Sequence, residues 1–498
     1  MSMLLFFKQS SGWLILPGQQ RSGDAYQRWT VSKRPRLRWA IVYALVVCAS
    51  LATAEDNKLD QQFQSAVAHY HAGQLPQAAA QLEELLPQVP RSFEVHELLG
   101  LVYAAQSQNA KAVEQLQIAA RLKPDSAAAR TNLAAALVRA GNPELAGQQF
   151  RKALELEPHD YDANHNLGEF YIQTGKIADA APFLEEAQHI APTSYDNGYD
   201  LAQAYLLTGR LGPARKLVQN LVQQKNTGEL HNLLGQIEEK DGKFVEAANE
   251  FGIAAHMDPS ESNLFDWGSE FLLHRTYEPA IEVFTKATER YPQSPRLFIG
   301  LGMALYSRGK YDDAVKALLT AADLDPADPR CYLFLSKAYD SSPNQAEDVI
   351  RRFRRFSELQ PENARALYYY AMSLWKGKRA EDPGFDLRQV ESLLRKSIAL
   401  DAKLFEAHVQ LGNLYADQRE YAKSIPEYTR ALELNPNLPD AHYRLGQDYV
   451  HVGQKDRAQG EFEIYQKLRA EHMAEVDKER AEVQQFVYSA KAAPSTKP

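Results

Sequence analysis

Proline residues recur along most of this 498-residue chain at a nearly constant interval. They stand at 90, 124, 158 and 192, at 259, 292, 326 and 361, and at 436. Most steps are 33 to 35 residues; the steps of 67 and 75 each hold two periods, with Asn226 and Ala402 in the vacant slots. Because proline cannot continue a helix, each one marks a connection between repeated units. The chain is therefore expected to be an array of repeats rather than two to four globular domains.

Small residues mark two further positions inside each interval. A glycine, alanine or serine recurs 24 residues before the proline slot, and in most units an alanine follows twelve residues later, so that two helices can cross closely. Between them a glycine marks a turn, because a left-handed residue ends a helix at little cost. These turn glycines are Gly73, Gly141, Gly175, Gly209, Gly242, Gly309 and Gly453. Each unit is predicted to be helix, turn, helix, and twelve units end at Ala470.

This lattice of positions resembles the tetratricopeptide repeat family. One unit carries the pattern in Leu167, Gly168, Tyr171, Gly175, Ala180, Ala187 and Pro192. The resemblance covers residues 59–470, although the family's tryptophan slot holds other residues, such as His96, Arg130 and Asn164. It implies an all-α fold, an α-solenoid of about twelve helix-turn-helix repeats that forms a right-handed superhelix. Residues 471–489 keep an apolar spacing and are predicted to form a C-terminal capping helix, and residues 490–498 a disordered tail.

Basic residues precede an apolar segment near the N-terminus. Lys33, Arg34, Arg36 and Arg38 lead into residues 39–54, which end in Ala-Thr-Ala before Glu55. This order is typical of a secretory signal peptide, and sixteen residues reach only about 24 Å as a helix, short of the ~30 Å hydrocarbon core. Residues 1–54 are thus predicted to be an N-terminal extension with a signal peptide, and the protein to be periplasmic or extracellular. The alternative is an uncleaved leader that anchors the chain in the inner membrane, its sole membrane contact.

Charge and cysteine content argue against several kinds of ligand. Residues 55–498 carry 49 basic and 63 acidic groups, a net charge of -14, whereas nucleic acid requires a basic face. Once the leader with Cys48 is removed, Cys331 is the remaining cysteine, so no intrachain disulfide or thiolate zinc site can form. The densest group of metal-ligand residue types, His159, Asp160, Asp162 and His165, suits a helix start better than a metal. No catalytic motif was found, so neither cofactor nor metal is expected, and the chain is predicted not to be an enzyme.

The resemblance also implies where a partner would bind. In the family, the first helices line the concave face, and positions 2, 5, 6, 9 and 12 of each repeat face a bound peptide. Carried over, repeats three to seven present a polar, acidic groove, and repeats eight to ten present aromatic groups with a row of arginines. The candidate partner-binding residues are Asn132, Asn166 and Asp200 in the first half and Arg296, Met303, Tyr306, Arg330, Phe334, Arg365, Tyr368, Tyr369 and Trp375 in the second.

These observations predict a scaffold of the cell envelope that binds a protein or peptide, of an identity the sequence leaves open, in its concave groove. Two alternatives remain. The chain could be the substrate-recruiting subunit of an enzyme system, for example for glycosyl transfer, acting with a separate catalytic chain. It could also be a structural envelope protein that associates with itself.

Overall fold

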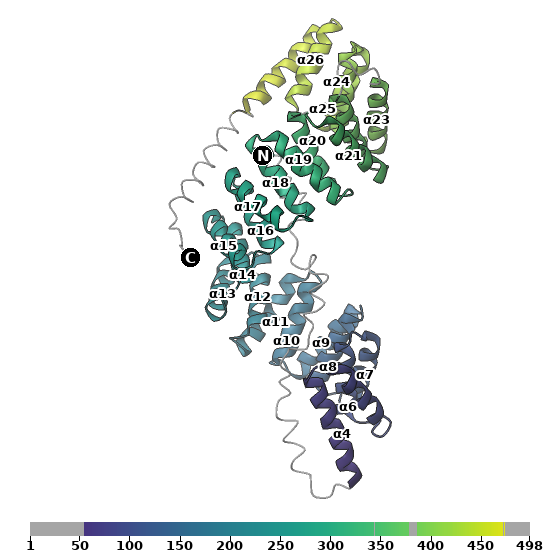
Figure 1. Cartoon of the computed structure of the whole chain (residues 1–498), viewed down its shortest axis with the longest axis vertical. Coiled ribbons are helices and arrows are strands. Elements are labelled where there is room, and N and C mark those ends of the chain that lie inside the picture. The colour runs from purple at the N-terminus through teal and green to yellow at the C-terminus, as the bar shows by residue number, and fades with distance from the viewer. Residues whose placement is uncertain (1–53, 343, 378–385, 472, 474–498) are drawn as a thin grey trace. The chain divides into compact units, whose positions relative to one another are not determined.

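The computed structural model describes residues 54–342, 344–377, 386–471 and 473, and every regular element in these ranges is an α-helix (Figure 1). The predicted all-α repeat fold is confirmed. Contacts divide the chain into unit 1, Met1–Asn226, and unit 2, Thr227–Pro498. The boundary follows Asn226, the slot where repeat five lacks its proline. The predicted signal peptide, most of the capping helix and the tail lie outside the described residues.

The described helices of unit 1 pair as the first and second helices of five repeats. The pairs are α4 (Ala54–His71) with α5 (Leu75–Leu85), α6 (Phe93–Ala105) with α7 (Asn109–Leu122), α8 (Ala127–Arg139) with α9 (Pro143–Leu156), α10 (Tyr161–Gln173) with α11 (Ile177–Ile190), and α12 (Tyr195–Leu207) with α13 (Leu211–Gln224).

The described helices of unit 2 continue the pattern through repeats six to twelve. The pairs are α14 (Gly228–Lys240) with α15 (Phe244–Met257), α16 (Glu261–Leu273) with α17 (Tyr277–Arg290), α18 (Pro295–Arg308) with α19 (Tyr311–Leu324), α20 (Pro329–Ser341) with α21 (Ala346–Leu359), α22 (Ala364–Lys376) with α23 (Leu387–Leu400), α24 (Phe405–Asp417) with α25 (Tyr421–Leu434), and α26 (Pro439–His451) with the helical residues 455–471. No helix in the described ranges is long and apolar enough to cross a membrane.

The first helices of repeats two to ten all begin at a residue whose side chain caps the helix. In each case the side-chain oxygen accepts a hydrogen bond from a backbone N–H two or three residues later, which is worth about 1 kcal/mol. The caps are Ser92, Ser126, Asp160, Ser194, Thr227, Ser260, Ser294, Asp328 and Asn363. Repeats eleven and twelve differ, because α24 and α26 follow Leu404 and Leu438, whose side chains supply no cap.

The small residues lie where the two helices of a repeat cross, as predicted. A Cβ atom added at Gly168 would lie 2.5 Å from the Leu184 side chain, and one added at Gly302 would lie 2.5 Å from the Leu318 side chain. At the turn, the seven predicted glycines have φ between 72° and 85°, the left-handed region in which glycine is favoured. Each second helix therefore packs directly on the backbone of its first helix.

A polar clamp occupies the slot in which the family carries tryptophan. His96, Arg130 and Asn164 each hydrogen-bond the proline carbonyl six residues earlier, at 3.1, 2.8 and 2.8 Å. In several repeats the same side chain also bonds the residue nineteen positions later, on the second helix. These pairs are His96–Gln115, Arg130–Gln149, His231–Glu250, His408–Glu427 and His442–Glu461. The clamp ties both helices to the connection that precedes them.

Candidate binding groove

The candidate site in unit 2 lies on three first helices, α18, α20 and α22. Helix α18 contacts α20, and α20 contacts α22, so the outer residues of these three helices form one surface, which we call the first-helix face. Residues three or four apart share one side of a helix. Arg365, Tyr368 and Met372 of α22 follow this spacing, and Arg330 and Lys337 of α20 lie two turns apart on one side of their helix.

Each of the three predicted arginines is held by an acidic residue. The Arg296 guanidinium lies 3.7 Å from the Phe265 ring centroid and 3.7 Å from an Asp266 oxygen, with only 14% of its side chain exposed. Burial lowers the pKa of Arg296, and Asp266 opposes this shift. Arg296 is therefore a packing residue, and this corrects the expectation that it is open to a partner.

The other two arginines remain about half exposed. Arg330 Nη2 lies 2.7 Å from Asp328, the cap of its own helix, and Arg365 Nη1 lies 3.3 Å from Glu406 of α24. Their side chains are 45% and 46% exposed. Both side chains therefore keep exposed surface beside these contacts.

The predicted apolar residues divide into two groups. Met303, Phe334 and Tyr369 are at most 6% exposed, because they pack into the interior of their repeats; Tyr369, for example, lies 5.7 Å from the Phe353 ring of α21. These three residues belong to the core, and their expected exposure in the groove is corrected. Tyr306, Tyr368 and Trp375 are partly exposed, and the latter two pack on the core of repeats ten and eleven. They are the aromatic groups that a partner could contact.

Two charged groups on this face were missed by the sequence analysis. Lys337 is partly buried, and Asp340 is exposed and pairs with Lys376 at 3.1 Å. They occupy positions 9 and 12 of repeat nine, which the family pattern assigns to the groove. Their positions in the repeat would have predicted both residues, but the candidate residues chosen from repeats eight to ten were only arginines and apolar residues.

The candidate residues of unit 1 already bond within the protein. Asn132 Nδ2 donates to Glu97 at 3.1 Å, and Asn166 Nδ2 donates to the Asp162 carbonyl at 2.7 Å. Burial raises the pKa of Glu97 to about 7, against the Asn132 hydrogen bond, which lowers it. Asp200 is partly exposed and has further interactions of its own. Asn132 and Asn166 thus lie on first helices, and their side-chain N–H groups already donate within the protein.

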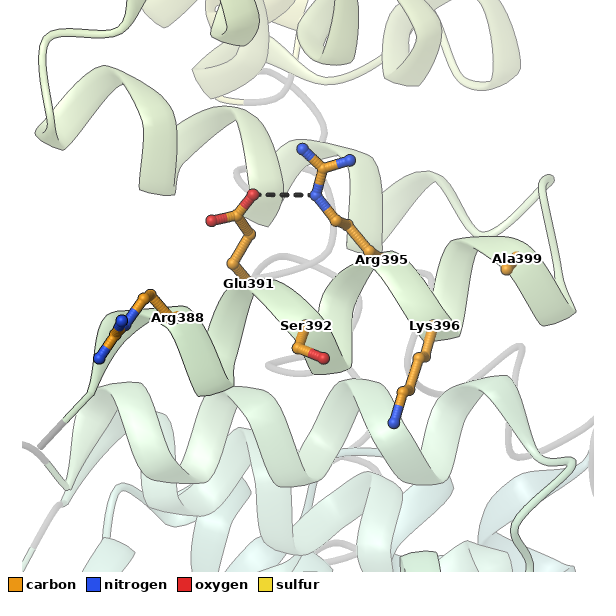
Figure 2. Close-up of a pocket in the computed structure, with 6 residues that line it drawn as sticks. All are labelled: Arg388, Glu391, Ser392, Arg395, Lys396 and Ala399. Carbon is orange, nitrogen blue, oxygen red and sulfur yellow. Dashed lines mark hydrogen bonds and ion pairs between the residues drawn. The ribbon is translucent and has the colours of Figure 1, made fainter.

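Two open hollows lie on repeat ten of unit 2. The hollow of about 400 Å³ is lined only by side chains of α23, namely Arg388, Glu391, Ser392, Arg395, Lys396 and Ala399. Figure 2 shows them along one helix, with Glu391 and Arg395 joined at 2.9 Å. The other, of about 590 Å³, includes Arg365 and Asn363. In the described residues no group of three His, Cys, Asp or Glu side chains is arranged to hold a metal.

Family comparison agrees with this architecture. Two sequence models described as tetratricopeptide repeat match this chain. One matches residues 174–237, and the other matches residues 63–195 in three overlapping copies and residues 265–329 in one. A third model, described as TPR repeat, matches residues 412–453. Together the matches cover more than half of the chain. The chain belongs to the tetratricopeptide repeat family. Its architecture is that of a protein-interaction scaffold, in which the family's tryptophan is replaced by the polar clamp.

Curated relatives match only part of this chain. The TPR repeat-containing protein YpiA of Bacillus subtilis is 27% identical over 38% of this chain and 42% of its own length. The human protein O-mannosyl-transferase TMTC3 is 23% identical over 39% of this chain and 20% of its own length. This chain therefore spans less than half the length of either relative.

A solved structure that is similar to part of this chain is that of PilW, described as a widely conserved type IV pilus biogenesis factor. It is 23% identical to this chain, covers 43% of this chain and 97% of PilW, and gives a TM-score of 0.38.

Proposed function

We propose that this chain is a non-catalytic scaffold that holds a protein or peptide segment against the first-helix face of repeats eight to ten. The observation that carries the proposal is the combination of three partly exposed aromatic groups with two half-exposed arginines on consecutive helices. Aromatic groups beside arginine are typical of binding hot spots, because they bury a large area at a low entropic cost.

We infer that the chain catalyses no reaction of its own. Its buried thiol illustrates the reason: Cys331 is fully buried, and burial raises its pKa, whereas a nucleophilic cysteine needs an exposed site that favours the thiolate. We place the scaffold in the cell envelope because of the basic and apolar leader at residues 33–54.

A second candidate function follows from the TMTC3 match. That relative is named as a protein O-mannosyl-transferase, and the part that resembles this chain covers only 20% of it. This chain could supply the corresponding substrate-recruiting function to a catalytic subunit encoded separately. Co-purification with a glycosyltransferase would favour this candidate, and recovery of only non-enzymatic partners would exclude it.

The main proposal is tested by capturing partners from envelope extract and measuring their affinity for variants of the full chain. Trp375→Ala is expected to cost about 2 kcal/mol of binding or more, because a hot-spot aromatic is lost. Arg330→Ala should mainly reduce the salt dependence and slow association. Asn166→Ala in unit 1 is the control. Loss of binding in the Asn166 variant alone would place the site elsewhere and reject the proposal.

A further inference from the structure

Lys337 is a partly buried cation on the first-helix face. It lies on α20 between Arg330 and Asp340, and no hydrogen bond or ion pair joins its side chain to another residue of the described ranges. The nearby acids are engaged elsewhere, since Asp340 pairs with Lys376 at 3.1 Å and Asp328 with Arg330 at 2.7 Å. A partly buried ammonium group in this state costs stability.

The charges that surround Lys337 do not balance. Glu406 and Arg365 both act on it electrostatically, and they bond each other at 3.3 Å. Burial lowers the pKa of Lys337; Glu406 opposes this shift and Arg365 adds to it. Two cations therefore share one carboxylate, and this part of unit 2 carries an excess positive charge.

A carboxylate brought by a ligand would restore the balance. Arg365 is 46% exposed and offers five N–H donors in a planar fork, whereas Lys337 offers a point charge on a flexible stem. Tyr368, partly exposed on the same side of α22 as Arg365, provides an apolar contact beside them. Repeats eight and eleven continue on either side, so a bound chain can run past the site in both directions.

We propose that Lys337 and Arg365 together bind an acidic side chain within an extended partner segment, and that the apolar residue two positions along that segment packs on Tyr368. This inference rests on the proposed function and names the chemistry of the partner. Side chains two residues apart in an extended segment point to the same side, so an acidic and an apolar residue at this spacing can both face the protein. Glu406 then competes with the acidic side chain of the partner for Arg365.

The first test measures stability without any ligand. Lys337→Met replaces an unpaired, partly buried cation by an apolar side chain of similar length, and it is expected to raise the melting temperature of unit 2. Lys316→Met is the matched control, because Lys316 is 66% exposed and pairs with Asp313 on α19. This substitution removes the same charge and should leave stability nearly unchanged. A lower melting temperature for Lys337→Met would mean that the fold already holds this ammonium group, and would overturn the subsite.

The second test uses the full chain and a twelve-residue peptide that repeats Glu-Ser-Leu-Ser, so that each Leu follows a Glu by two positions. The peptide is acetylated and amidated, and it is compared with its counterpart that carries Gln in place of Glu. The Glu peptide is expected to bind, Lys337→Met to weaken it about tenfold, and Lys316→Met to leave its affinity unchanged. Glu406→Gln should tighten binding about threefold, because the competitor is removed.

The remaining outcomes separate the subsite from the proposed function. If both peptides bind equally and Trp375→Ala weakens both, the groove is retained and the carboxylate subsite is overturned. If the Gln peptide binds only when its C-terminus is free, the ligand group is a chain terminus and the assignment to a side chain is overturned. Failure of the Glu peptide to bind at about 1 mM overturns the subsite, whereas the partner-capture experiment still tests the proposed function.

Discussion

At the scale of single residues, three turns hold a non-glycine residue in the left-handed conformation. Ser107, Arg275 and Arg419 have φ of 61°, 57° and 60°, and they occupy the slot that is glycine in seven other repeats. A side chain in this region clashes with its own backbone, which costs roughly 1 kcal/mol. These three turns are therefore strained positions in an otherwise regular lattice.

Arg419→Gly is expected to stabilise unit 2 by about 1 kcal/mol, because glycine relieves this clash at an exposed turn. Thermal unfolding of the full chain measures the effect. Gly453→Ala, at the equivalent turn of the next repeat, should lower stability by a similar amount. Equal melting temperatures for the two variants would contradict the account.

Glu97→Gln should make unit 1 less sensitive to pH. Because burial raises the pKa of Glu97 from 4.5 to about 7, the stability it contributes is complete below pH 4.5 and is lost as the pH rises through 7. The variant should therefore match the natural chain at pH 4.5 and exceed it at pH 8 by about 1 to 2 kcal/mol, allowing for solvent screening. Hydrogen exchange of α6 and α8 at both pH values reports it, with the exposed Glu94→Gln as control.

At the scale of helices, the repeat was predictable because its demands are local. A glycine at 168 or 302 is required by the distance of closest approach between two helices, and a turn glycine by the sign of φ, so both leave fixed spacings in the sequence. Burial of Met303, Phe334 and Tyr369 was not predictable in this way, since it depends on how the neighbouring second helices pack. The charge imbalance around Lys337 depends on Arg365 and Glu406, which come from two other repeats.

Gly302→Ala should destabilise unit 2 by about 1 to 3 kcal/mol, because the new methyl group would lie 2.5 Å from the Leu318 side chain. Adding Leu318→Ala should cost less than the sum of the two single changes, since the methyl group then fits the vacated space. Gly460→Ala is the control: nothing lies within 4 Å of its added Cβ atom, and it should stabilise its helix. Additive costs in the double variant would argue against a direct contact.

At the scale of the whole molecule, each unit keeps its own buried core. One cluster runs through unit 1 from Ala66 to Phe170, and others lie in unit 2 around Leu411 and around Tyr428. The chain carries a net charge of -8, and residues 1–54 contribute seven basic groups and one acidic group. Removal of this segment would leave the remainder at -14 and so more strongly acidic.

The exported chain is expected to begin at or near Glu55, because Ala52 and Ala54 provide the small residues that a leader peptidase requires. N-terminal sequencing of protein recovered from the envelope identifies the first residue. A mature chain that retains Trp39 would show that the leader is kept as an anchor.

The pattern of helix caps has a mechanical consequence. Helices α24 and α26 start without a side-chain cap, whereas the preceding first helices of unit 2 have one. Among the described residues, the main contacts of each hairpin are with its neighbours in the chain. If unit 2 is pulled from its C-terminal end, its hairpins are expected to unfold one at a time, and repeats twelve and eleven are expected to unfold at the lowest force. Glu406 lies near the start of α24, in repeat eleven, and it pairs with Arg365. Tension on the C-terminal end would therefore break this ion pair before the hairpins of repeats eight to ten unfold.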